Sequence, residues 1–140
     1  MAFTGNYSCN TLRSGLVDGT INFATGTFYL ALYTNTATLD FTTTEYSSTG
    51  EASGGNYVAG GLVVTATVAS VNTSAGSTVY VNFSSPSWTG VITARGALIY
   101  TPGANGAVCV LDFGSDKTSA NTFTVTMPDN TSTSALIRLV

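Results

Sequence analysis

The sequence predicts an all-β protein: an antiparallel, jelly-roll-like β-sandwich of about eight strands with at most one short helix. Three observations predict it. Apolar side chains alternate with Thr, Tyr or Asn over several short segments, and no helical period extends over a long window. From residue 62 onward, apolar segments recur about every fifteen residues with Gly, Ser, Pro or Asn clusters between them.

The first expected element is a short helix over Tyr7–Val17. Asn6 or Ser8 is suited to cap its start, and Gly15 or Gly19 to end it, because polar residues favour the N-cap and glycine the C-terminal end. We assign residues 1–19 to an N-terminal arm or short helix within one domain that spans residues 1–140.

Seven segments carry the strand pattern. In the first of them Phe28, Leu30 and Leu32 share one face, and the opposite positions of such strands are commonly polar, which is typical of a sheet with one face on a core. Two weaker candidates, Thr38–Tyr46 and Asn56–Val58, would raise the count to eight or nine. The seven segments are Thr27–Tyr33, Leu62–Ala69, Thr78–Phe83, Val91–Tyr100, Ala107–Phe113, Thr122–Met127 and Ala135–Val140.

The Gly-rich stretch Gly50–Gly61 is too short for a linker between domains. We expect an ordered loop in which several glycines adopt positive φ, and no domain boundary.

Charged residues are scarce: the 140 residues include four Lys and Arg, seven Asp and Glu and no His, against 25 Thr and 15 Ser. The cations Arg13, Arg95, Lys117 and Arg138 are scattered, so no basic stripe predicts nucleic-acid or membrane-surface binding. No apolar run approaches the roughly 18 residues of a membrane span. We therefore expect neither nucleic acid nor membrane as a partner, and the start of the chain lacks the pattern of a secretory leader.

Without His, the Ser/His/Asp and Cys/His mechanisms cannot be assembled from this chain alone. Carboxylates such as Asp112 and Asp116 leave a glycosidase pair or a calcium site conceivable, but they fall mostly in loops or at strand ends. We predict no enzymatic activity, no cofactor and no metal.

Cys9 and Cys109 match no metal-binding spacing. The simpler interpretation is two free thiols, with Cys109 in the core. A disulfide between them is the alternative, and it requires the N-terminal segment to lie on the strand that holds Cys109.

Five residues are candidates for an interface. Tyr46, Tyr57 and Trp88 fall in or near loops, where aromatic side chains anchor partners or stack on sugars; packing beneath their own loops is the alternative. Arg13 and Arg95 are candidates to steer the chain toward an acidic partner, or to pair with carboxylates inside the domain.

Several segments together resemble a known family, the capsid cement (decoration) proteins of tailed bacteriophages. The resemblance spans roughly residues 20–140, and the N-terminal segment, which carries less charge here than is usual in the family, departs from it. The segments are Phe28–Thr34, the Thr-rich run to Tyr46, Glu51–Gly61, Thr93–Tyr100 and Leu111–Gly114.

This resemblance implies a non-enzymatic virion protein, made in the host cytoplasm, on the outer surface of the phage head. There it would bridge subunits of the major capsid protein and self-associate as a homodimer or homotrimer. An edge strand, either Ala135–Val140 or the N-terminal segment, is a candidate to pair with the capsid protein or a second copy. The alternatives are a carbohydrate-binding protein and a tail or fibre protein used in host attachment.

Overall fold

The computed structural model describes residues 3–140 and contains ten strands and one helix within that range. Every strand pairing is antiparallel, which confirms the predicted all-β sandwich with one short helix. The elements are β1 Tyr7–Ser8, α1 Asn10–Asp18, β2 Phe28–Tyr33, β3 Leu62–Val64, β4 Ala66–Thr73, β5 Gly76–Phe83, β6 Ser87–Thr89, β7 Thr93–Tyr100, β8 Ala107–Thr118, β9 Thr122–Thr124 and β10 Ile137–Leu139.

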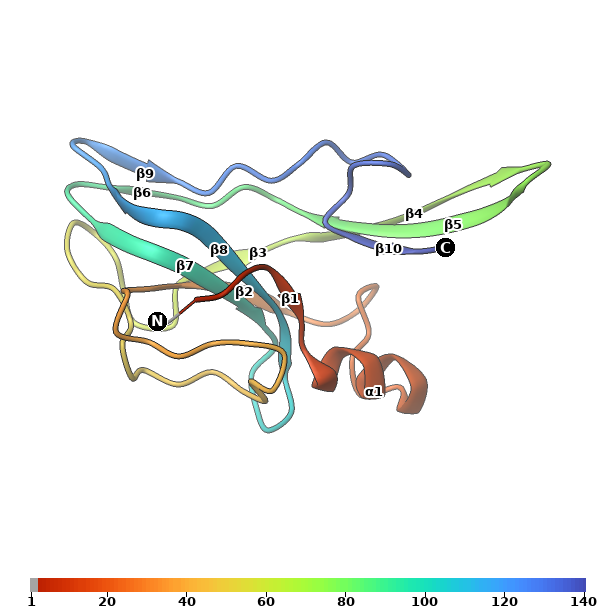
Figure 1. The fold of residues 1–140 in the computed structure, drawn as a ribbon, viewed down its shortest axis with the longest axis horizontal. Helices are drawn as coiled ribbons and strands as arrows, with labels where there is room; N and C mark the ends of the chain where they lie inside the picture. Colours follow the sequence, from red (N-terminus) through yellow and green to blue (C-terminus); the bar gives the residue numbers. More distant parts are fainter. Residues whose placement is uncertain (1–2) are drawn as a thin grey trace.

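The strands form two layers. One layer is a five-stranded sheet in the order β1-β8-β7-β2-β3, and the other contains a three-stranded sheet, β10-β5-β4, and the pair β6-β9. Figure 1 shows the second layer along the top of the molecule, with α1 below it. The main core lies between the layers, where Phe28, Leu30 and Leu32 point from one face of β2, as their spacing predicts.

The central strands β2 and β7 are buried on both faces, whereas the sequence predicted strands with one wet face. A second core fills the outer face of the five-stranded sheet, where Tyr33 and Leu98 pack with Phe3, Cys9 and Leu39. These last three residues come from the N-terminal segment and from residues 34–61, which together cover this face (Figure 1). A sheet covered on both sides selects near-continuous apolar strands, which explains the run Phe28–Tyr33.

The predicted N-terminal helix is present but begins later than expected. Tyr7 and Ser8 form β1 on the edge of β8, and the helix starts after Cys9, so neither Asn6 nor Ser8 is its N-cap. It ends at Gly19, whose φ of 82° is the left-handed conformation that glycine adopts readily, as predicted.

The two weaker strand candidates, Thr38–Tyr46 and Asn56–Val58, are loops, so that part of the strand prediction was wrong. Local hydrogen bonds replace strand pairing in the first of these segments. The Asp40 carboxylate accepts bonds from the Thr42 N–H at 2.7 Å and from the Thr42 hydroxyl at 2.5 Å. Such side-chain bonds to nearby main chain favour turns over extended structure. Conversely, β6 forms in a segment to which the sequence pattern assigned no strand, and Trp88 pairs there with Phe123 across β6 and β9.

The Gly50–Gly61 loop is ordered and uses positive φ, as predicted. Gly55 has a φ of 51°, and a Cβ on it would lie 2.2 Å from the carbonyl oxygen of Thr89. Only glycine lets the loop approach the end of β6 this closely.

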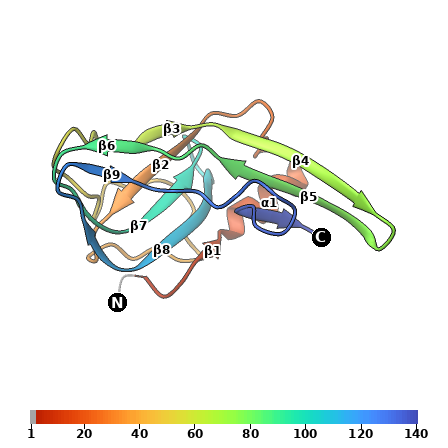
Figure 2. The same cartoon turned by 90° about the horizontal axis from the view of Figure 1, so that it is seen from above.

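Strands β4 and β5 form a hairpin that projects from the rest of the molecule, as Figures 1 and 2 both show. We call residues 66–83 the β4–β5 hairpin and the rest of the described chain the body. Only the end of β5 at the base, residues Val81–Phe83, is buried, and no residue of β4 is. β10 pairs with β5, so β4 is the outer strand of this sheet.

Candidate functional site

Trp88, one of the five interface candidates, lies in the core. Its side chain is 1% exposed and packs against the Tyr57 ring, whose centroid is 5.5 Å away. The indole Nε1 has no hydrogen-bond partner among residues 3–140. Trp88 therefore packs beneath its own loop and is not exposed to a partner in this structure.

Tyr46 and Tyr57 are linked through one carboxylate, that of Glu51. Its oxygens accept hydrogen bonds from the Tyr46 hydroxyl at 2.7 Å, the Tyr57 hydroxyl at 2.6 Å and the Gly60 N–H at 2.7 Å. The Tyr57 hydroxyl also accepts a bond from the N–H of Leu32 in β2. The network holds the Gly-rich loop against the sheet. The hydroxyls of Tyr46 and Tyr57 therefore bond to groups inside the body.

The environment of this network keeps its tyrosines protonated. Burial, followed by the hydrogen bond and negative charge of Glu51, raises the pKa of Tyr46 and of Tyr57 above the ordinary range. For the neighbouring Tyr100, burial and then the charge of Glu51 raise the pKa to about 12. These phenols act as stable hydrogen-bond donors and are poorly suited as bases.

A pocket of about 290 Å³ opens beside this network. Tyr100 lies between two other rings, with its centroid 4.9 Å from that of Tyr46 and 5.7 Å from that of Tyr29. Tyr29 and Tyr46 are half-buried, and the exposed Glu45 also lines the pocket. Stacked rings beside a carboxylate offer an apolar platform and a hydrogen-bond acceptor, which suits a small ring-shaped ligand.

The two candidate arginines differ. The Nε of Arg95 donates a hydrogen bond to Asp112 in an ion pair at 3.2 Å, the internal pairing that was the alternative to a steering role. The same carboxylate oxygen accepts a bond from the Gly114 N–H. Arg13 is exposed and donates to the Ser8 hydroxyl at 3.1 Å, which leaves its charge accessible to a partner.

Both cysteines are free and buried. The N-terminal segment does lie on β8, with Ser8 opposite Cys109, but Cys9 points into the core outside the five-stranded sheet and Cys109 into the core between the layers. Burial raises the pKa of Cys9 to about 12 and also raises that of Cys109. The free-thiol interpretation is therefore confirmed.

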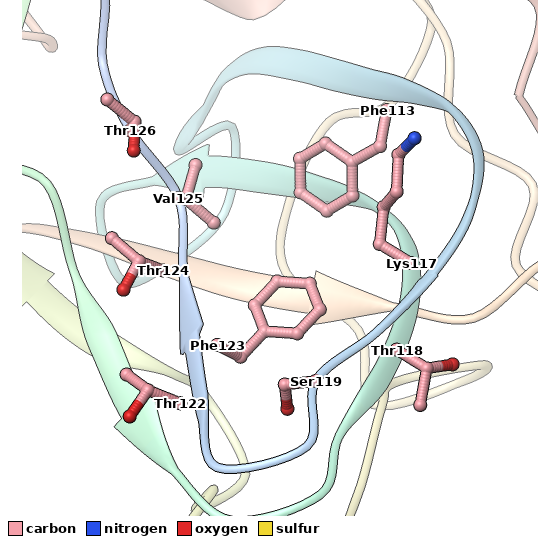
Figure 3. Close-up of a pocket in the computed structure, with 9 residues that line it drawn as sticks. All are labelled: Phe113, Lys117, Thr118, Ser119, Thr122, Phe123, Thr124, Val125 and Thr126. Atoms are coloured by element: carbon pink, nitrogen blue, oxygen red, sulfur yellow. The ribbon is translucent and has the colours of Figure 1, made fainter.

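A groove of about 390 Å³ lies between β9 and the far end of β8. Figure 3 shows the rings of Phe113 and Phe123 pointing into it, with the Lys117 side chain beside them. The two ring centroids are 6.1 Å apart. The groove is shallow, two aromatic rings line its floor, and the Lys117 ammonium lies at its edge.

A second groove, of about 400 Å³, lies beneath the β4–β5 hairpin. We call it the hairpin groove. Val68 is 48% exposed, Val79 39% and Leu139 52%, although all three line it. The sequence held one signal of this surface, an uncharged run over Ala66–Thr73, of which the first four residues fell in the strand expected over Leu62–Ala69. The other lining residues are Leu16, Gly19, Ile21, Asn22, Phe23, Ala24, Val81 and Ile137.

Within residues 3–140, no group of three His, Cys, Asp or Glu side chains is placed to hold a metal ion. The helix in that part of the chain is not of the length and apolarity that crossing a membrane requires. Comparisons with family models, with curated proteins and with solved structures each found no match to the chain.

Proposed function

We propose that this chain is a non-enzymatic structural protein, a cement protein that binds the outside of a tailed-phage head and bridges subunits of the major capsid protein. Two kinds of support lead to it. The segments from Phe28 to Gly114 resemble that family, and the hairpin groove is an apolar surface between the projecting hairpin and the body.

The observation that carries the proposal is the exposure of Val68, Val79 and Leu139 around the hairpin groove. Burying apolar surface stabilises a complex by roughly 25 cal/mol per Å² before the costs of association. No charged residue lies in β4 or β5, so a partner that covers the hairpin would not have to desolvate an ion there. Such a surface suits lasting contact with a protein.

A cement protein acts by mass action. A protein that binds the assembled shell and not its separated subunits shifts the equilibrium toward the shell. Because many copies bind one particle, a modest affinity at each site is enough to stabilise the whole lattice. The fold needs only rigidity and a contact surface for this role.

The test is co-sedimentation of the purified chain with heads of the phage that encodes it. We expect the chain to sediment with empty heads, and Leu139→Lys to reduce occupancy at least tenfold because it places a cation in the hairpin groove. Val91→Lys is the matched control, since Val91 is 60% exposed and lies outside the groove. Absence of binding, or equal loss in both variants, would contradict the proposal.

Carbohydrate binding is the second candidate function, and the pocket beside Tyr29, Tyr46 and Tyr100 is the observation that favours it. A glycan array probed with the free protein tests it: binding that Tyr29→Ala abolishes would support a sugar site. A tail or fibre protein would also be able to use such a pocket in host attachment, and antibody labelling of virions on the tail instead of the head would favour that role.

A further inference from the structure

The outer edge of β4 is an eight-residue stretch of main chain that lies along the projecting hairpin. Its pairing with β5 runs in one register from Ala66 opposite Phe83 to Thr73 opposite Gly76. Thr65 is one residue before the strand, and its carbonyl oxygen accepts a hydrogen bond from the Ser84 N–H at 3.0 Å. This bond fixes which residues of β4 face β5.

Main-chain groups of an antiparallel strand point alternately toward one neighbour and the other. Because Thr65 bonds toward the β5 side, the groups of Thr67, Ala69, Val71 and Thr73 also point there. Those of the intervening residues point away from the sheet, and in residues 3–140 no hydrogen bond from another segment reaches them. The residues with outward groups are Ala66, Val68, Ser70 and Asn72.

Exposed edges in natural proteins are commonly protected by charged side chains, proline, bulges or short length. β4 has none of these within its eight residues, Ala-Thr-Val-Ala-Ser-Val-Asn-Thr. The outer edge of β8 beyond Leu111 differs, because it carries Asp112, Asp116 and Lys117 and is interrupted by Gly114 at a φ of 81°. β4 is thus a long, uncharged edge that is open to another strand.

We propose that β4 pairs antiparallel with β4 of a second copy of this chain, about a two-fold axis perpendicular to the sheet. The two three-stranded sheets then join into one continuous sheet across the dimer. This arrangement satisfies the outward main-chain groups of both copies and gives a closed, self-complementary interface.

Charge favours this edge over the charged edges of β8 and β10 for contact with a second copy. The chain carries a net charge of −3, so approach of identical copies is unfavourable wherever charges face each other. β4 and β5 contain no charged residue, and Arg138 in β10 lies at the opposite edge of the same sheet. Pairing through β4 therefore brings identical surfaces together without like-charge contact.

A two-fold axis perpendicular to the sheet places equivalent faces of the two three-stranded sheets on the same side of the dimer. Val68 and Val79 of each copy share the face toward the hairpin groove, so the grooves of both copies open on the same side of the dimer. One dimer would present two grooves to one surface. The pairing itself rests on β4 alone and does not depend on the proposed cement function.

Sedimentation velocity of the free protein tests the pairing with two complementary variants. Val68→Lys with Ser70→Lys, and Val68→Glu with Ser70→Glu, each set like charges against each other across the two-fold axis. We expect the unaltered chain to sediment as a dimer, each variant alone as a monomer, and an equimolar mixture of the two as a mixed dimer.

The matched control is Val58→Lys with Val91→Lys, which adds the same charges at exposed valines of the body and should leave the dimer intact. Circular dichroism of every variant should match that of the unaltered chain. A second measurement needs no substitution: the amides of Val68 and Ser70 should exchange with solvent slowly in concentrated protein and at least tenfold faster on dilution into the monomer range.

Several outcomes would overturn the pairing. They are an unaltered chain that is monomeric or trimeric, a dimer that survives in either charged variant, a mixture that stays monomeric, and β4 amides whose exchange is independent of concentration. A monomeric chain that still binds phage heads would refute the pairing and leave the cement proposal standing. A dimer that binds no heads would do the reverse.

Discussion

The body and the β4–β5 hairpin are built from similar strands but use them differently. In the body, β2 and β7 are covered on both faces, and the carboxylates of Glu51 and Asp112 accept three and two hydrogen bonds inside the domain. In the hairpin, β4 has no buried residue and its outer edge is unpaired within the described part of the chain. Aromatic and charged side chains stabilise the body through internal contacts. The hairpin, in contrast, leaves apolar side chains and main-chain groups available to a partner.

Closeness to a loop in the sequence did not make two of the aromatic contact candidates fully accessible. Trp88 and Tyr57 stand close to loops in the sequence, yet the same loops fold back over them. The exposure of the hairpin valines was not predicted, because they follow an ordinary strand pattern. Exposure in this molecule follows from which strands lack a covering layer, and not from residue type.

The largest effect is expected in the core of the body. Leu30 is fully buried in β2, and Leu30→Ala should lower the free energy of unfolding by about 2–5 kcal/mol, because it removes packed atoms and leaves a cavity. Urea denaturation followed by circular dichroism measures this change. A loss below about 1 kcal/mol would show that the sheet is not held tightly between its two cores.

The Glu51 network should give the next largest effect. Glu51→Ala leaves the hydroxyls of Tyr46 and Tyr57 without their acceptor, and we expect a loss of about 1–3 kcal/mol in the free energy of unfolding. Glu45→Ala, at an exposed carboxylate nearby, is the control and should change stability by less than about 0.5 kcal/mol. Equal effects in the two variants would mean that the network does not hold the loop.

Alkaline pH should weaken the body through its tyrosines. Tyr100 has a pKa raised from 10.0 to about 12, so between these values the unfolded chain has lost protons that the folded chain keeps. The contribution of Tyr100 to stability is therefore complete below pH 10.0 and declines as the pH rises toward 12. Urea denaturation at neutral pH and at a pH within this window measures the decline, and Tyr100→Phe should reduce it. Equal stability at both pH values would contradict the assignment.

The smallest effect on folding is expected in the hairpin. Val79 is partly exposed, and Val79→Thr keeps its β-branched shape, so the unfolding free energy of the monomer should change by about 0.5 kcal/mol or less. Denaturation at a protein concentration low enough to keep the chain monomeric provides the measurement. A change comparable with that of Leu30→Ala would place the hairpin in the folding core and remove the contrast between the two regions.

Much of the fold followed from local pattern. The alternation of Phe28, Leu30 and Leu32 identified β2 and the face that it turns to the main core, and Gly19 marked the end of α1. The second core did not follow, because the covering of Tyr33 and Leu98 by Phe3 and Leu39 depends on contacts between distant segments. The projecting hairpin was hidden for the same reason: Val68 and Val79 have the alternation of a strand on a core, and only the arrangement of the layers shows that little covers them.

Cryo-electron microscopy of the phage head tests most directly whether the chain is a cement protein that contacts the shell through its hairpin. We predict density for the chain on the outer surface of the head, with the hairpin groove against the major capsid protein and the Gly50–Gly61 loop of the body away from it. Density on the tail, density inside the head, or contact made through the body loops would contradict this account.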